Sequence, residues 1–175
     1  MVTSTLDRAS AYTAAAAVLD PEVPVLTIED LGVLRAVQVA EDGSVDVTIT
    51  PTYSGCPAMQ TIADDVATAL AEAGFGPVRV ATVLAPAWST DWMSEDGRRK
   101  LSEYGIAPPS PPSPTTGDRR NGPVQLTLGR RPELVACPQC GSTRTRELSR
   151  FGSTACKALW QCESCHEPFD HFKAI

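Results

Sequence analysis

The chain has 175 residues, 42% of them hydrophobic, and a formal net charge of −6. This is enough for one domain of typical size plus a small module, and the lack of an 18-residue apolar run argues against a membrane span. Residues 1–128 carry 8 basic and 16 acidic side chains, whereas residues 129–175 carry 7 and 5. An acidic main domain repels phosphate backbones, so we expect protein partners and no nucleic acid.

Residues 6–19 are rich in alanine and predict a helix that ends before Pro21. Its expected apolar face consists of Leu6, Tyr12, Ala16 and Leu19. Residues 20–32 predict an ordered loop, in which Thr27 caps a short turn and Gly32 ends it in the left-handed conformation.

Two strands follow, at residues 33–39 and 45–50, and the Asp42-Gly43 step between them predicts a hairpin. In the second strand Val45, Val47 and Ile49 alternate with polar residues, which predicts one buried face. A third strand at 78–84 comes after a helix, so we expect it to lie beside one of the first two.

Residues 50–57, here called the thiol loop, join the second strand to a helix that runs to about Ala73. Pro51 ends the strand, and Pro57 suits a first helical turn. Cys56 is therefore expected at or next to the helix N-cap, where the helix dipole would depress the thiol pKa and favour attack or soft-metal binding. The alternative is a small buried hydrophobe.

Trp88 and Trp92 lie four residues apart and predict either core packing or a wall that faces a partner. Residues 94–104 predict a helix with Ser94 as its N-cap and Gly97 as a weak point.

Residues 108–123 are rich in proline and predict a linker, because they cannot bury enough apolar surface to fold. The predicted domains are residues 1–107 and residues 124–175, and residues 124–128 resume an alternating, strand-like pattern.

Two Cys-x2-Cys pairs are the strongest chemical signal of the chain, and they predict a structural metal site in a zinc ribbon. The expected ligands are Cys137, Cys140, Cys162 and Cys165. Spacing alone does not distinguish zinc from iron. The expected strands are 143–151, 158–161 and 169–172.

Three further residues of this module are read as lying outside the ligand set. His166 and His171 are expected beside the metal shell or at the surface. Cys156 receives no ligand role, and it is either a thiol whose pKa Lys157 beside it lowers or a half-buried structural thiol, which is the commoner case. With so few cysteines outside the pairs and no signal-peptide pattern, we expect a reducing, cytoplasmic location.

Four stretches together resemble the PaaD family of bacterial phenylacetate degradation, within the wider family of cytosolic iron-sulfur assembly factors. They are DPEVPVLTIEDLG, TPTYSGCP, PAWSTDWM and FGSTACKALWQCESCHEPFDHFK. The resemblance implies a small α/β domain with a roughly three-stranded mixed sheet and two main helices, followed by the zinc ribbon.

The resemblance also implies a non-enzymatic role in maturing iron-sulfur proteins, with the phenylacetyl-CoA epoxidase, especially its iron-sulfur reductase, as client. It places the reactive thiol at Cys56 and the acidic loop at Asp20 to Glu22, whose carboxylates would assist or only cap a turn. Since one thiol cannot hold a cluster alone, our hypothesis is transient cluster or iron binding, shared with the assembly machinery, a client or a second copy of the chain.

Two other functions are open. The chain is alternatively a non-catalytic interaction subunit of the epoxidase, docking through Trp88, Trp92 and the ribbon. A nucleic-acid module that uses the ribbon's basic residues ranks last, because zinc-bound thiolates leave the ribbon close to neutral.

Overall fold

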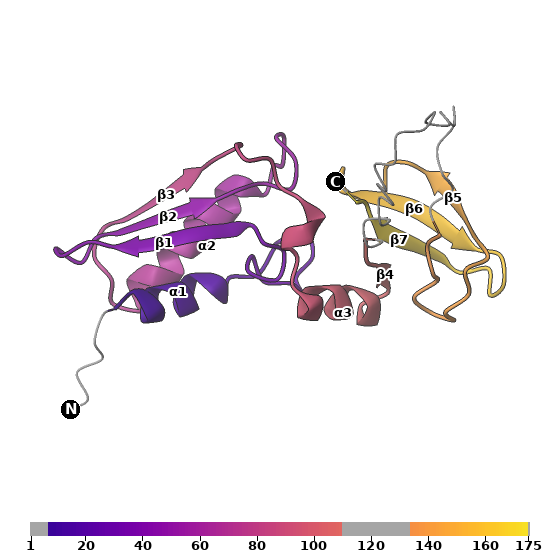
Figure 1. Ribbon diagram of the computed structural model, residues 1–175, viewed down its shortest axis with the longest axis horizontal. Helices are drawn as coiled ribbons and strands as arrows, with labels where there is room; N and C mark the ends of the chain where they lie inside the picture. The colour runs from indigo at the N-terminus through magenta and orange to yellow at the C-terminus, as the bar shows by residue number, and fades with distance from the viewer. Residues whose placement is uncertain (1–6, 110–133, 175) are drawn as a thin grey trace, which may run out of the picture.

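The structure is a computed structural model that describes residues 7–109 and 134–174. It has two sheets, one in an α/β domain and one in a ribbon (Figure 1). The predicted linker beyond residue 109 and the predicted strand at 124–128 lie outside the described residues.

The first sheet has the order β1-β2-β3. Strands β1 (Leu34–Val39) and β2 (Val45–Ile49) form the predicted antiparallel hairpin, and β3 (Val78–Thr82) lies parallel to β2. Gly43 adopts φ +82° in the hairpin turn, a conformation that glycine reaches without strain. The alternation predicted for β2 is confirmed, because Val45, Val47 and Ile49 are all buried.

Helices α1 (Arg8–Ala16) and α2 (Met59–Glu72) pack against each other and against the strands (Figure 1). Helix α2 buries Ile62, Val66 and Leu70, as its spacing predicted. The face predicted for α1 is confirmed at Ala16 and wrong at Tyr12 and Leu19, which are exposed, while Leu6 lies outside the described residues. The buried residues of α1 are Ala11, Ala15 and Ala16. Alanines let the helix approach its neighbours closely, whereas the Tyr12 hydroxyl reaches outward and donates to Glu29 at 3.0 Å.

The turn predicted at residues 27–32 is confirmed. The Thr27 hydroxyl accepts from the Asp30 N–H at 3.0 Å, and Gly32 has φ +67°. Asp30 also holds the following helix α3 (Glu95–Glu103), accepting from Ser94 Oγ at 3.0 Å and from Lys100 Nζ at 2.7 Å. These hydrogen bonds tie the 27–32 turn to α3.

The second sheet has the order β4-β7-β6-β5. Strands β5 (Thr145–Ser149), β6 (Lys157–Cys162) and β7 (Pro168–Phe172) are the three predicted ribbon strands. Strand β4 (Ile106–Ala107) pairs in parallel with β7, although the sequence placed residues 106–107 in the first domain. Two residues carry too little pattern to predict such pairing.

The ribbon packs directly onto the α/β domain. Cys156 and Phe172 belong to the same cluster of buried residues as the core of that domain. The rings of Trp88 and Phe172 lie 6.1 Å apart at this contact, which we call the domain interface. No helix in residues 7–109 or 134–174 has the length and apolarity needed to cross a membrane.

Candidate functional site

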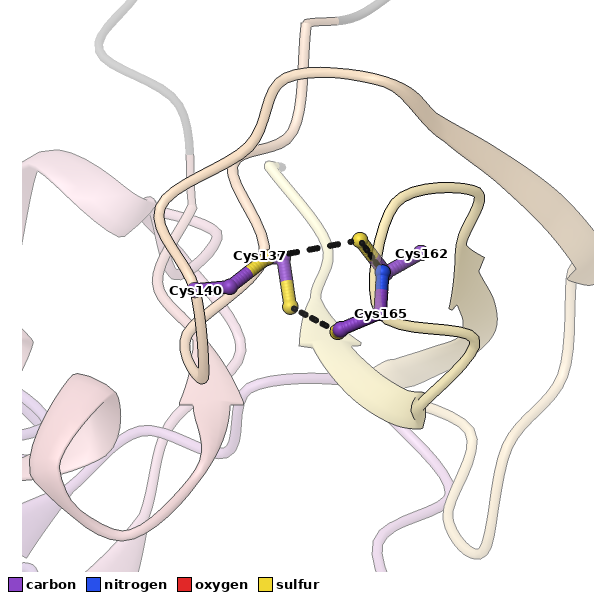
Figure 2. Close-up of side chains that lie close together, drawn as sticks. All are labelled: Cys137, Cys140, Cys162 and Cys165. Carbon is purple, nitrogen blue, oxygen red and sulfur yellow. Dashed lines mark hydrogen bonds between the residues drawn. The ribbon is translucent and has the colours of Figure 1, made fainter.

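The four paired cysteines of the ribbon converge on one point (Figure 2). Their sulfur atoms all lie within 4.8 Å of one another, with Cys137 and Cys165 at 3.8 Å and Cys140 and Cys162 at 3.6 Å. A tetrahedral zinc with bonds of about 2.3 Å places its sulfur ligands roughly 3.8 Å apart. The donor set therefore fits structural zinc, and four thiolates complete the tetrahedron.

Backbone N–H groups donate hydrogen bonds to a sulfur of the second cysteine pair, Cys162 and Cys165. The Cys162 sulfur accepts from the N–H of Cys165 at 3.4 Å and of Ser164 at 3.3 Å. These hydrogen bonds, together with those from the Cys165 and Cys140 thiols, outweigh burial and lower the pKa of Cys162 to about 6. The thiolate, which is the form that ligates zinc, is therefore stabilised by the turn itself.

The two turns end in the left-handed conformation, at Gly141 with φ +72° and at His166 with φ 65°. His166 is exposed, and its carbonyl accepts from Gln161 Nε2 at 3.3 Å. Its position directly after Cys165 repeats that of Gly141 after Cys140, which is the sequence signal for this turn role. His171 is buried instead, with its ring 5.7 Å from that of Trp160.

Cys56 lies in the thiol loop, two residues before the N-cap of α2 at Ala58. The prediction that it sits at or next to the N-cap is therefore wrong. Its side chain is half-buried and packs against the core of the α/β domain. Burial raises the pKa of Cys56, the Ala58 N–H opposes this, and the charges of Glu22, Asp20 and Cys156 raise it further. The predicted depression of the pKa is also wrong, because burial outweighs the hydrogen bond that the sulfur accepts from the N–H of the N-cap residue Ala58.

Asp20 and Glu22 differ in what they contact. Asp20 is buried, and its Oδ1 accepts from the N–H of Glu22 at 2.9 Å and of Val23 at 2.8 Å, so it caps a turn. Burial nevertheless raises its pKa. Within the described residues the Glu22 carboxylate, which is half-buried, has no hydrogen bond or ion pair. Glu22 therefore differs from Asp20 in that its carboxylate caps no turn, while the charges of both residues raise the pKa of Cys56.

Two ribbon residues reach this region, and no feature of the sequence located them there. Cys156 is 4% exposed, and burial raises its pKa. Lys157 lowers the pKa of Cys156, as predicted, but burial outweighs it. The Lys157 ammonium is itself buried, 3.5 Å from Asp170. Long-range packing places these residues, so local pattern does not reveal them.

The two tryptophans have different environments. Trp88 is 4% exposed and donates its indole N–H to the Leu31 carbonyl at 2.9 Å, as expected for the core-packing alternative. Trp92 is half-buried beneath the Arg35 guanidinium, 3.5 Å from the ring centre. Core packing therefore accounts for Trp88 and an interaction within the chain for Trp92.

A pocket of about 280 Å³ opens beside the thiol loop. Its lining includes Tyr53 and Ser54 of that loop, Leu84 after β3, and Trp88. Thr50 also lines it, and its buried hydroxyl has no hydrogen bond within the described residues. The pocket gives the thiol loop a concave, mainly apolar neighbour.

Two family models match the chain. Residues 8–83 match a model described as iron-sulfur cluster assembly protein, and residues 121–173 match one described as PaaD zinc beta ribbon domain. The first match contains Cys56, Asp20 and Glu22, and the second contains the four zinc ligands and Cys156.

Individual relatives match either nearly the whole chain or about half of it. A protein of Escherichia coli (strain K12), named as a 1,2-phenylacetyl-CoA epoxidase subunit, is 48% identical over 89% of this chain and 86% of its own length. An iron-sulfur protein maturation auxiliary factor of Porphyromonas gingivalis is 39% identical over 48% of this chain and 80% of its own length. A crystal structure of a DUF59 domain from Bacillus anthracis is 30% identical, with a TM-score of 0.51, over 54% of this chain and 90% of that one.

Proposed function

The chain belongs to the PaaD family, and from that membership we propose that it handles iron or an iron-sulfur cluster during maturation of the phenylacetyl-CoA epoxidase system. The observation that carries the proposal is the half-buried Cys56 thiol beside the Glu22 carboxylate, inside the region that matches iron-sulfur cluster assembly proteins. Relatives named as maturation auxiliary factors and cluster carriers support it.

In this proposal the zinc ribbon and the α/β domain have different chemical roles. The ribbon thiols saturate their metal and leave no open coordination position, so zinc stabilises the ribbon and does not react. Cys56 is a single thiol outside that centre, and iron-sulfur clusters normally take four cysteine-type ligands. Cys56 therefore supplies one ligand to cargo that further groups hold.

The client that we propose is the iron-sulfur reductase of the epoxidase, and the donor is the iron-sulfur assembly machinery. The chain itself makes and breaks metal-ligand bonds only, without turnover of an organic substrate. Docking of the client would fall next to the thiol loop, where the 280 Å³ pocket exposes Leu84 close to Tyr53.

The test is the metal content of the client. Cys56→Ser should leave the fold and the zinc intact, but the reductase matured with this variant should lack most of its iron and acid-labile sulfide. Gln60→Ala, an exposed change just after the loop, at the start of α2 and outside the pocket lining, is the matched control and should load the reductase normally. A fully loaded reductase with Cys56→Ser would remove the proposal.

A second candidate function is that of an interaction subunit, which the name of the Escherichia coli relative as a subunit favours. In that case the chain would co-purify with the oxygenase components at fixed stoichiometry. The Cys56→Ser variant would then co-purify and support epoxidase activity as well as the unmodified protein does.

A further inference from the structure

Strand β3 forms one edge of the first sheet, on the side away from β1 (Figure 1). The Val83 N–H donates to the Ile49 carbonyl at 2.9 Å, and the Pro77 carbonyl accepts from β2, at the same distance. Because the backbone groups of successive strand residues point to opposite sides, every second residue of β3 faces away from β2. These outward residues are Val78, Val80 and Thr82, whose N–H and C=O groups make no hydrogen bond within the described residues.

The other sheet edges carry features that hinder pairing with a further strand. Strand β1 has a register shift just after Leu34, and its Val37 carbonyl accepts from Arg8 Nε at 3.1 Å. Strand β5 has a register shift just after Glu147, and β4 has only two residues. In contrast, β3 pairs with β2 in a regular register and contains neither lysine nor proline. Among the described strands, β3 is therefore the edge best suited to accept another strand.

The pocket beside the thiol loop lies at the C-terminal end of β3. Leu84, two residues after the strand, lines this pocket together with Tyr53 and Trp88, and it is 58% exposed. The pocket volume of about 280 Å³ is below the range of about 300–1,000 Å³ that is typical of small-molecule sites, so it suits one apolar side chain. A strand that pairs with β3 and continues past Thr82 would bring such a side chain to Leu84.

A second copy of the chain would leave this pocket empty if its own β3 paired with the edge. Antiparallel pairing of two β3 strands uses all the outward residues of both copies when Val80 lies opposite Val80. In that register Gly76 lies opposite Leu84, and glycine has no side chain to enter the pocket. The pocket therefore favours a segment of another protein as the added strand.

The surroundings of this edge are acidic. Helix α2, which packs against β3, carries Asp64, Asp65 and Glu72 and no basic residue. The one cation of β3, Arg79, is already paired with Asp46 of β2 at 3.1 Å. A partner segment with lysine or arginine next to its apolar side chain would therefore complement the charge of this surface.

We propose that the β3 edge and the pocket together form a docking site for an extended, basic segment of the client, which adds to the sheet as a strand and places an apolar side chain against Leu84. The inference rests on the proposed function for the identity of this client. Backbone hydrogen bonds provide the affinity in this mode of recognition, and the pocket selects the side chain. Tyr53 and Ser54 of the thiol loop line the same pocket, so docking brings the client next to the loop that carries Cys56.

The main test measures binding of the epoxidase reductase to the full-length, zinc-loaded protein by isothermal titration calorimetry. Thr82→Pro should weaken binding at least about tenfold, because proline removes an outward N–H and its ring blocks the added strand, while the bonds to β2 stay in place. Leu84→Glu should weaken binding by a similar factor, since it places a charge in a mainly apolar pocket. Binding should also weaken as the salt concentration rises, and an affinity that salt does not change would refute the basic segment.

Thr82→Ser, which keeps the N–H, and Leu148→Glu, an exposed change on β5, are the matched controls and should bind the reductase normally. If Thr82→Pro and Leu84→Glu bind like the unmodified protein, the docking site is wrong, while the proposed function is decided separately by the metal content of the reductase. A dimer of the protein alone that Thr82→Pro dissociates would show a second copy at the edge and would overturn the proposal. Absence of binding by the unmodified protein would overturn it as well.

A second measurement uses the unmodified protein, in case the variants do not fold. In the free protein, amide hydrogen exchange should be slow at Ala81 and Val83, whose N–H groups face β2, and fast at Val80 and Thr82. Binding of the reductase should slow exchange at Val80 and Thr82 by at least about tenfold, because an added strand pairs with both N–H groups. Unchanged exchange at these two amides in the saturated complex would overturn strand addition.

Discussion

Cys56 keeps its proton more firmly than an ordinary thiol. Burial raises its pKa, and Glu22 and Asp20 raise it further because a thiolate would stand close to their negative charges. A protected thiol of this kind is a poor nucleophile at neutral pH but becomes a ligand when a cation displaces the proton. Residue-level electrostatics therefore favour metal handling over covalent catalysis.

Removing the Glu22 charge should make the Cys56 thiol easier to deprotonate. Glu22→Gln should lower the pKa of Cys56, so the thiolate fraction at pH 8 and the rate of iodoacetamide alkylation should rise a few-fold. In the unmodified protein the rate at Cys56 should keep rising above pH 9, since its pKa lies above the ordinary value of 9.0. Peptide mass spectrometry over a pH series gives the rate at this one cysteine.

Glu41→Gln, an exposed change in the β1–β2 turn, is the matched control and should leave the alkylation profile unchanged. A Cys56 that titrates below pH 9.0 in the unmodified protein would contradict the raised pKa. Such a result would restore the helix-start interpretation of this thiol.

At the scale of elements, α3 is fixed by how closely it approaches the 27–32 turn. Gly97 lies in the first turn of α3, and its N–H donates to the Ser94 side chain at 2.8 Å. A Cβ at Gly97 would lie 2.9 Å from the Asp30 carbonyl oxygen and 3.0 Å from the Asp30 Cβ. Gly97, predicted as a weak point of this helix, is therefore the place where α3 comes so close to Asp30 that only glycine fits.

Gly97→Ala should therefore destabilise the protein, although alanine is the better helix former by about 1 kcal/mol. The carbonyl oxygen that the new methyl group meets is backbone and cannot rotate away, so we expect a net loss of about 1–3 kcal/mol. Thermal unfolding measures it as a lower Tm. Ser102→Ala, an exposed change in the same helix, should not lower Tm, and an unchanged or higher Tm for Gly97→Ala would refute the close approach.

The elements also show what the sequence could predict. The alternation in β2, the spacing in α2 and the cysteine pairs are local patterns, and each is confirmed. The alanine face of α1 was missed because apolar size does not reveal which face approaches a neighbour. Pairing of residues 106–107 with β7 and the placement of Cys156 depend on contacts across more than sixty residues of chain. Tertiary packing decides such features.

At the scale of the whole molecule, the strands of the ribbon connect the zinc ligands to the domain interface. Strand β6 begins beside Cys156 and ends at the zinc ligand Cys162, and β7 carries Phe172 to the domain interface. A module as small as residues 134–174 cannot bury a sufficient core unaided, and structural zinc contributes apparent free energies of about 10–16 kcal/mol in small zinc domains. The position of Cys156 therefore depends on metal bound elsewhere in the ribbon.

Stripping zinc with a strong chelator should unfold the ribbon and leave the α/β domain folded. Hydrogen exchange should become fast in β5, β6 and β7 and stay slow in β1 and β2, which have their own core. Trp88 fluorescence should change because Phe172 leaves its ring. Cys165→Ser should reproduce these effects without chelator, and slow exchange in β6 and β7 after zinc removal would show that packing on the α/β domain alone holds the ribbon.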